Sequence, residues 1–169
     1  NIADKLSVTR SDFRAVWHDE NRVIILTKSY DESENSYFQS VDFKGNILQT
    51  YSIENEEVKK LKSYKVIPFL QDKILVCGVE YLNNKHHLNF YIPDEDNYLH
   101  LKKRISINSA LNNGIGIFEI LPTPDNQILI NLVHKDILDD DWAPKWNFWV
   151  KFDPTQLGLT TRTKDYITS

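Results

Sequence analysis

The chain has 169 residues, with 20 Lys and Arg against 24 Asp and Glu, a net charge of −4 and 41% hydrophobic residues. A chain of this size buries roughly two-thirds of the surface that it exposes when unfolded, so no disulfide or metal is needed to hold a core. The acidic balance argues against nucleic-acid binding, which requires a basic face. No apolar run approaches the ~18 residues that cross a bilayer, so we expect no membrane span.

Cys77 is the single cysteine, which excludes an internal disulfide, and its apolar surroundings predict a small buried hydrophobe. The sequence opens at Asn1 and contains no methionine. This start fits a processed mature end or the edge of an expressed piece. We expect a soluble protein, and both a cytoplasmic location and export with a removed signal remain open.

Short β-rich runs separated by turn residues predict strands along the whole chain. In the first part they cover residues 13–17, 22–28, 36–43 and 47–53. In the second part they cover residues 65–70, 73–79, 87–92 and 98–105. In the third part they cover residues 117–121, 127–133, 147–153 and 157–163.

Two short helices are expected between these groups of strands. Asn55 begins an acidic start, and Glu56 and Lys60 form an i,i+4 pair, which together predict a helix over residues 54–63. A single helical turn is expected near residues 107–112.

The pattern of strands repeats three times. Arg22, Lys73 and Gln127 mark equivalent positions at the start of the second strand, with spacings of 51 and 54 residues. The repeats span approximately residues 13–63, 64–112 and 113–166. We therefore expect one all-β domain over residues 1–169, built of three four-stranded antiparallel meanders.

Such repeats resemble the blades of a β-propeller. Three blades are too few to close a ring, so the resemblance implies an incomplete propeller that self-associates or belongs to a longer chain. An antiparallel β-sandwich or barrel is the alternative fold, because it produces similar alternating runs.

The third repeat carries an insertion between its second and third strands. The connections equivalent to it are residues 30–35 and 81–87, whereas the third runs over residues 134–146. Insertions in repeat proteins mark loops that often bind partners. The candidate binding residues are aromatic, acidic or basic members of this segment: His134, Asp139, Asp140, Asp141, Trp142 and Trp146.

The acidic residues of the insertion, with Asp136, suggest a calcium site, because Ca²⁺ takes six to eight oxygen ligands. Their spacing lacks the glycine and the distal Glu of the common calcium loop, so a solvated acidic loop is the simpler interpretation. No other cofactor or metal is expected.

Three further residues, His86, His87 and Trp149, are interpreted as structural residues. His86 and His87 are expected to be exposed at the end of a loop, and Trp149 is expected in the core. No Gly-x-Ser-x-Gly elbow or helical His pair occurs, so no catalytic residue is assigned and an enzyme is the less favoured class.

These observations favour a noncatalytic protein-interaction module that presents an acidic loop with Trp anchors to a partner, and a basic partner surface would suit this loop. An inhibitor or immunity-type protein is one specific version. The alternative is a carbohydrate-binding domain or part of a propeller glycosidase, in which Trp142 or Trp146 stacks on sugar. A segment of a larger scaffold is a third reading.

Overall fold

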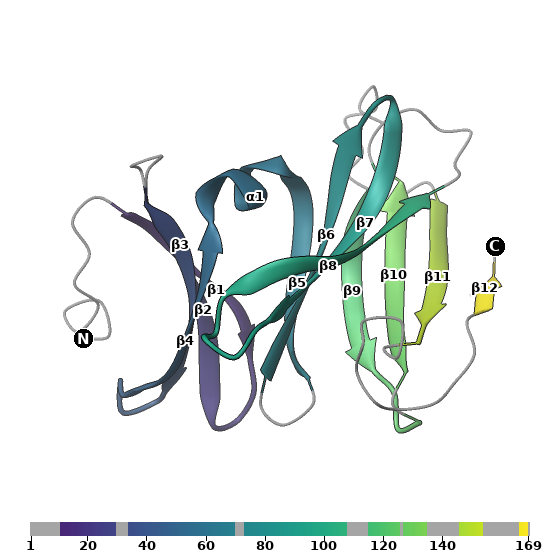
Figure 1. Ribbon diagram of the computed structural model, residues 1–169. Coiled ribbons are helices and arrows are strands. Elements are labelled where there is room, and N and C mark those ends of the chain that lie inside the picture. Colours follow the sequence, from purple (N-terminus) through teal and green to yellow (C-terminus); the bar gives the residue numbers. More distant parts are fainter. Residues whose placement is uncertain are drawn as a thin grey trace, which may run out of the picture. The chain divides into compact units, whose positions relative to one another are not determined.

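The computed structural model describes residues 11–29, 34–69, 73–107, 115–125, 127–134, 146–153 and 166–168. These residues form three four-stranded antiparallel sheets and one short helix (Figure 1), and none of the sheets closes into a barrel. The prediction of an all-β fold made of three four-stranded meanders is therefore confirmed. The propeller arrangement of these sheets stays a prediction.

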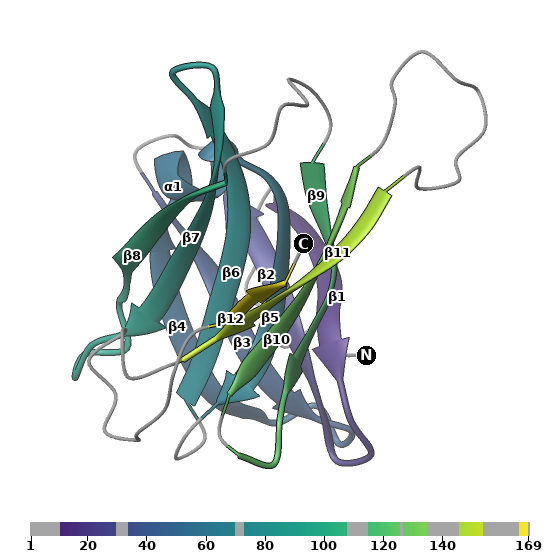
Figure 2. The ribbon, with the colours of Figure 1, turned by 90° about the vertical axis from the view of Figure 1, so that its right-hand side faces the viewer.

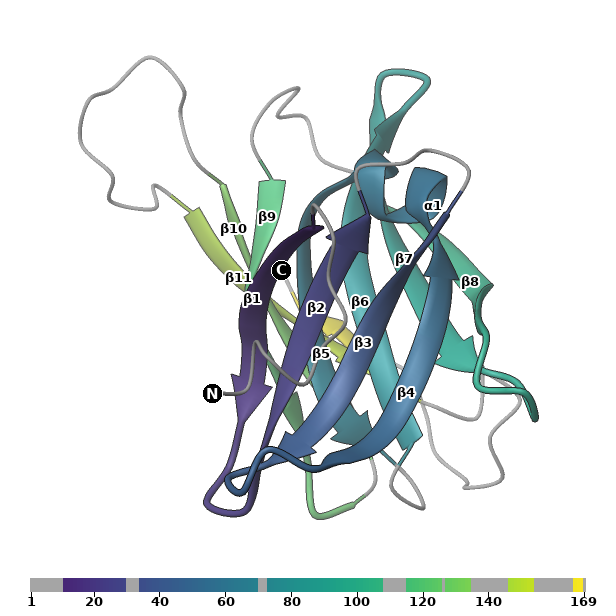
Figure 3. The same ribbon diagram turned by 90° about the vertical axis from the view of Figure 1, so that its left-hand side faces the viewer.

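The first sheet has the strand order β1-β2-β3-β4 (Figure 3). Its strands are β1 (Ser11–His18), β2 (Arg22–Ser29), β3 (Asn35–Asp42) and β4 (Ile47–Glu54). Ile24, Ile25 and Leu26 are buried, so β2 is covered on both faces. Phe38 on β3 is buried while Tyr37 beside it is exposed, as the period of two along a strand requires.

The helix α1 (Asn55–Lys60) is shorter than the predicted range of residues 54–63, because the chain turns into a strand at Leu61. Its ion pairs join Glu56 to Lys59 and Glu57 to Lys60, at i,i+3 spacing, where the sequence predicted an i,i+4 pair. The predicted helical turn near residues 107–112 begins at the last residue of a strand and otherwise lies outside the described residues.

The second sheet has the order β5-β6-β7-β8. Its strands are β5 (Leu61–Phe69), β6 (Lys73–Leu82), β7 (Lys85–Pro93) and β8 (Leu99–Ile107). β6 is buried on both faces, and Leu61 lies over Gly78, where an added Cβ would be 2.6 Å from Leu61 Cδ1. The edge strand β8 is largely exposed, which suits its Lys102, Lys103 and Arg104.

The third sheet has the order β12-β11-β10-β9 (Figure 2). Its strands are β9 (Ile115–Pro122), β10 (Ile128–His134), β11 (Trp146–Phe152) and β12 (Tyr166–Thr168). The core residues Ile128, Ile130 and Leu132 alternate along β10 and are fully buried. The strand predicted at residues 157–163 lies outside the described residues. On the side away from β10, β11 pairs with β12.

The chain divides into two compact units. One comprises residues 1–60 and 92–100, and the other comprises residues 61–91 and 101–169. The first unit includes the tip of the β7–β8 hairpin, where the N–H of Ser52 donates to the carbonyl of Asn97 at 3.0 Å. The single domain expected over residues 1–169 stays a prediction.

An aspartate sets the turn that follows the third strand of a sheet. The N–H groups of Asp42 and Asp94 donate to the carbonyl four residues later, at 3.0 and 2.9 Å. Their carboxylates accept backbone N–H groups two and four residues later. Gly45 (φ 85°) and Asn97 (φ 59°) supply the left-handed residue of each turn. Asp153 stands at the equivalent place after β11, and the residues that follow it lie outside the described part of the chain. We call Asp42 and Asp94 the turn aspartates.

Candidate interaction site

The predicted insertion lies at one end of the β10–β11 hairpin. Backbone pairing sets His134 opposite Trp146 as the last residue pair of the two strands. The structure therefore brings these two predicted site residues together at the base of the connection. The other four, Asp139, Asp140, Asp141 and Trp142, lie outside the described residues.

The equivalent connection in the second sheet is a tight turn. Leu82 pairs with Lys85, and the two residues between them, Asn83 (φ 51°) and Asn84 (φ 58°), are both left-handed. Two left-handed residues are the signature of a type I′ turn, whose twist matches that of the strands that it joins. The predicted loop over residues 81–87 is therefore too long, and residues 135–145 are an addition to a hairpin that two residues can close.

The strand β7 begins at Lys85, earlier than predicted, and this changes the interpretation of the adjacent histidines His86 and His87. His86 and His87 belong to β7, and His86 is buried, so the prediction that both are exposed at a loop end is wrong. His86 lies across the β6–β7 ladder from Tyr81, with ring centroids 4.8 Å apart, and Lys62 lies over the Tyr81 ring at 4.7 Å. This hairpin end is thus an ordered stack of aromatic and cationic side chains.

Cys77 lies in the environment that the sequence predicted, and Trp149 does not. Cys77 is fully buried, as predicted, and burial raises the pKa of its thiol, so it is not a reactive nucleophile. Trp149 was expected in the core but is 38% exposed. Alternation along a strand shows that Trp149 and Phe148 face opposite sides, but it does not show which side is covered.

A buried polar cluster joins three strands of the second sheet. Glu80 on β6 and Asn89 on β7 are both buried, and the Asn89 Nδ2 donates to a Glu80 oxygen at 2.7 Å. Arg104 on β8 donates to the same Glu80 oxygen at 2.7 Å and to Asn89 Oδ1 at 3.1 Å. The guanidinium compensates the buried carboxylate, so the cluster holds β6, β7 and β8 in register.

This cluster was not predicted from the sequence. The available signal was a polar residue inside an otherwise apolar strand, which both Glu80 and Asn89 provide. The contacts among Glu80, Asn89 and Arg104 stabilise the sheet.

A second polar cluster lies at the tip of the β7–β8 hairpin. His100 Nε2 lies 2.8 Å from Asp94 Oδ2, and the rings of Tyr98 and His100 are 4.8 Å apart. Burial raises the pKa of Tyr98, and the nearby Glu54 carboxylate raises it further. The pKa of Asp94 is lowered, first by the Tyr98 backbone N–H and then by His100. These contacts fix the shape of the tip.

The described residues contain no group of three or more His, Cys, Asp or Glu side chains that could hold a metal ion. Asp136, Asp139, Asp140 and Asp141, which suggested calcium, lie outside these residues, so that site stays a prediction. Among the described elements, no helix has the length and hydropathy to cross a membrane.

Comparison with known proteins supports the fold. No family model matches the sequence, and no curated protein matches it. A chain in the cryo-EM structure of Morganella morganii TcdA4 is structurally similar, with a TM-score of 0.61 and 11% sequence identity. The match covers 93% of this chain and 8% of that chain. Our chain therefore corresponds in fold to a small part of a much longer polypeptide.

Proposed function

We propose that the protein is a noncatalytic interaction module that binds a protein partner through the insertion at residues 135–145, carried by the β10–β11 hairpin. The observation that carries the proposal is the pairing of His134 with Trp146. Because that pair closes the ladder, the whole insertion is held at one strand end. Loops positioned in this way by a sheet are common binding elements.

The composition of the insertion supports a protein partner. Trp142 offers a large, rigid side chain that loses little conformational entropy when it is buried, and such residues dominate binding energies. Asp139, Asp140 and Asp141 add negative charge beside it, which would steer a basic surface toward the loop. We therefore expect a partner with a basic rim around an apolar pocket.

The experiment compares the wild-type chain with a variant that carries Trp142→Ala and Trp146→Ala. Proteins of the source organism are captured on each chain and identified by mass spectrometry, and the partner is then purified for binding measurements. We expect the double variant to lose at least about tenfold in affinity, because hot-spot aromatics contribute ~2 kcal/mol or more. Phe43→Ala is the matched control, because Phe43 is an exposed aromatic residue in the turn between β3 and β4.

Thermal denaturation of the double variant separates binding from folding. If the two tryptophans instead pack beneath their own loop, their loss should destabilise the chain by about 3 kcal/mol or more each. A large fall in melting temperature would contradict the proposal. A glycan array with and without Ca²⁺ tests the carbohydrate alternative. Sugar binding that is lost in Trp146→Ala would support that alternative.

A further inference from the structure

The strand β8 is the outermost strand of the second sheet. Its neighbour on one side is β7, and none of the described strands pairs with it along the other side. Figures 2 and 3 both show β8 at the margin of this sheet. The bridge between Ser52 and Tyr98 ends just before β8 begins at Leu99. Residues 101–107 therefore present an edge of backbone donors and acceptors, which is a template for a further strand.

Backbone hydrogen bonds at the start of β8 show which of its residues face outward. The carbonyl of Tyr98 accepts from the Asp94 N–H at 2.9 Å, on the β7 side, whereas the carbonyl of Asn97 accepts from the Ser52 N–H at 3.0 Å, on the opposite side. Because this direction alternates along a strand, even-numbered residues of β8 face β7 and odd-numbered residues face outward. Every even-numbered residue of β8 is exposed, whereas the odd-numbered residues other than Leu101 are buried or half-buried. This regular alternation is typical of a strand without a bulge.

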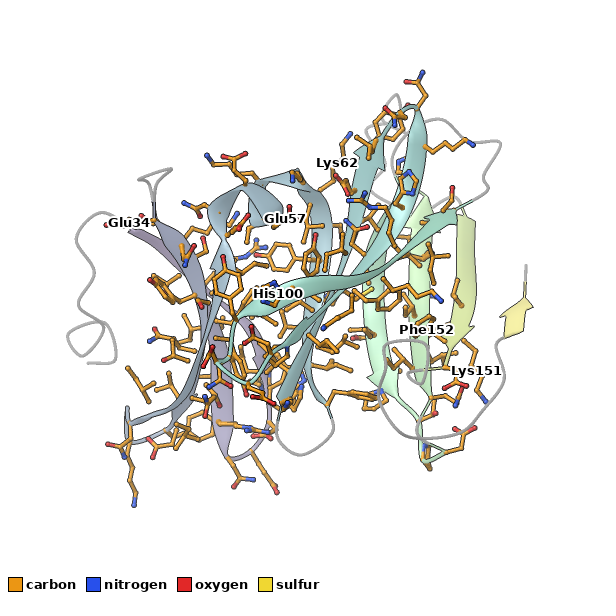
Figure 4. The ribbon with its side chains drawn as sticks, in the orientation of Figure 1. Glu34, Glu57, Lys62, His100, Lys151 and Phe152 are labelled. Atoms are coloured by element: carbon orange, nitrogen blue, oxygen red, sulfur yellow. The ribbon has the colours of Figure 1, made fainter. Side chains whose placement is uncertain are left out.

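The two faces of β8 differ in chemistry. One face carries the polar residues His100 (Figure 4), Lys102, Arg104 and Ser106. The opposite face carries Leu101, Lys103, Ile105 and Ile107. On the polar face, Arg104 is paired with the buried Glu80, whereas Lys102 forms no ion pair within the described part of the chain. On the opposite face, Leu101 is 37% exposed and Ile105 is half-buried, so apolar surface lies beside the open edge.

Positive charge is concentrated at this edge, although the chain has a net charge of −4. The strands β7 and β8 contain no Asp or Glu, and their cationic residues are Lys85, Lys102, Lys103 and Arg104. Pairing of β8 with the same strand of a second copy would bring like charges together, which is unfavourable. An acidic strand would meet complementary charge instead.

We propose that β8 binds an extended acidic segment of a partner protein, which adds to the second sheet as an antiparallel strand along residues 101–107. The outward backbone groups supply hydrogen bonds, and alternate side chains of the segment supply specificity. Its acidic side chains lie beside Lys102, and its apolar side chains cover Leu101 and Ile105. This surface is separate from the insertion at residues 135–145, and each can bind without the other.

The probe is a fluorescently labelled peptide that alternates Val and Glu and matches residues 101–107 in length. Fluorescence anisotropy measures its binding to the full chain. In antiparallel pairing, the residues opposite Leu101 and Ile105 direct their N–H groups toward β8, so the Val nitrogens face the protein and the Glu nitrogens face solvent. We expect methylation of the Val nitrogens to weaken binding by at least about tenfold, because backbone hydrogen bonds are lost. Methylation of the Glu nitrogens should have little effect.

Variants of the protein locate the peptide on β8. Lys102→Glu should weaken binding by about tenfold at low salt, because a like charge replaces a complementary one. Lys73→Glu, the same change at an exposed position at the start of β6, should bind as the wild type does. Hydrogen exchange of the backbone amides should slow over residues 101–107 when the peptide is bound. Circular dichroism checks that both variants are folded, and the methylated peptides test the wild-type chain directly.

Equal affinities of the two methylated peptides would overturn the proposal, because attraction between charges does not depend on backbone N–H groups. A single-stranded DNA that binds as tightly as the peptide and competes with it would also overturn the proposal, since it would identify a general site for polyanions. The same holds if the wild-type chain does not bind the peptide, or if Lys102→Glu is folded and binds it as the wild type does.

Discussion

The turn aspartates make the hairpins sensitive to acid. The pKa of Asp42 lies below its ordinary value of 3.8, chiefly because the Asn46 side chain donates to its carboxylate. The pKa of Asp94 is lowered in the same direction, chiefly by the backbone N–H of Tyr98. A carboxylate whose pKa is lowered by folding stabilises the fold above its unfolded pKa and loses that effect as the pH falls.

We therefore expect stability to decline between about pH 5 and pH 2 as these carboxylates are protonated. The variant Asp42→Asn with Asp94→Asn should be less stable than the wild type at neutral pH, and the difference should shrink in acid. Urea unfolding at a series of pH values measures both. An equal pH dependence in the two proteins would show that other groups cause the acid response.

Because Glu80 is buried, we expect the stability of the fold to depend strongly on the cation that pairs with it, Arg104. Arg104→Met would remove a charged donor from the buried Glu80 carboxylate and leave it the Asn89 amide among the described residues. Breaking a buried pair costs ~3–5 kcal/mol, but Arg104 is 36% exposed and solvent weakens the interaction, so we expect about 2 kcal/mol.

Urea unfolding of this variant is compared with Lys102→Met, a change of similar shape at an exposed position of the same strand. That control should alter stability by less than about 0.5 kcal/mol. Adding Glu80→Met to Arg104→Met should recover much of the loss, because no buried charge then remains. Equal effects of Arg104→Met and Lys102→Met would exclude a specific role for the pair.

At the scale of elements, Asn55 connects the helix α1 to the first sheet. Its side chain accepts a hydrogen bond from the Ser36 hydroxyl and donates to the Ser29 carbonyl at 2.9 Å. Asn55 and Ser36 are both buried, so an unsatisfied partner would be costly. We expect Asn55→Ala to destabilise the fold by about 1–3 kcal/mol in urea unfolding.

The exposed Glu56, the next residue of α1, provides the control for this experiment. Its ion pair with Lys59 lies at the surface and contributes little, so Glu56→Ala should cost a few tenths of a kcal/mol. If Asn55→Ala is as mild as Glu56→Ala, the link between helix and sheet is not stabilising.

Strands could be predicted from sequence more reliably than their ends. Alternating apolar residues locate β3 and β10 because the period of two is a local property. The end of β6 was predicted too early, because the polar residues between Tyr81 and His86 resemble a loop. In the structure only Asn83 and Asn84 form the turn. The size of a connection depends on such turn conformations, which hydrophobic periodicity does not report.

At the scale of the molecule, the threefold repetition of the meander was predictable because its turn chemistry recurs along the chain. Which face of a sheet is covered was not predictable, since this depends on packing between sheets. Trp149 illustrates the difference. Alternation along β11 predicts that Trp149 and Phe148 face opposite sides of the sheet, but it does not predict that the Trp149 side chain is exposed. The buried Glu80 was overlooked for a different reason: its compensating Arg104 comes from another strand of the same sheet, far away in the sequence.

We expect that the insertion can be removed without changing the strands β10 and β11. His134 and Trp146 pair as Leu82 and Lys85 do around Asn83 and Asn84, so Asn-Asn should replace residues 135–145 as a tight turn. The decisive measurement is the affinity of this shortened chain for the purified partner, together with its melting temperature. We predict loss of partner binding with little change in melting temperature; a shortened chain that is folded and binds as the wild type does would contradict the proposed function.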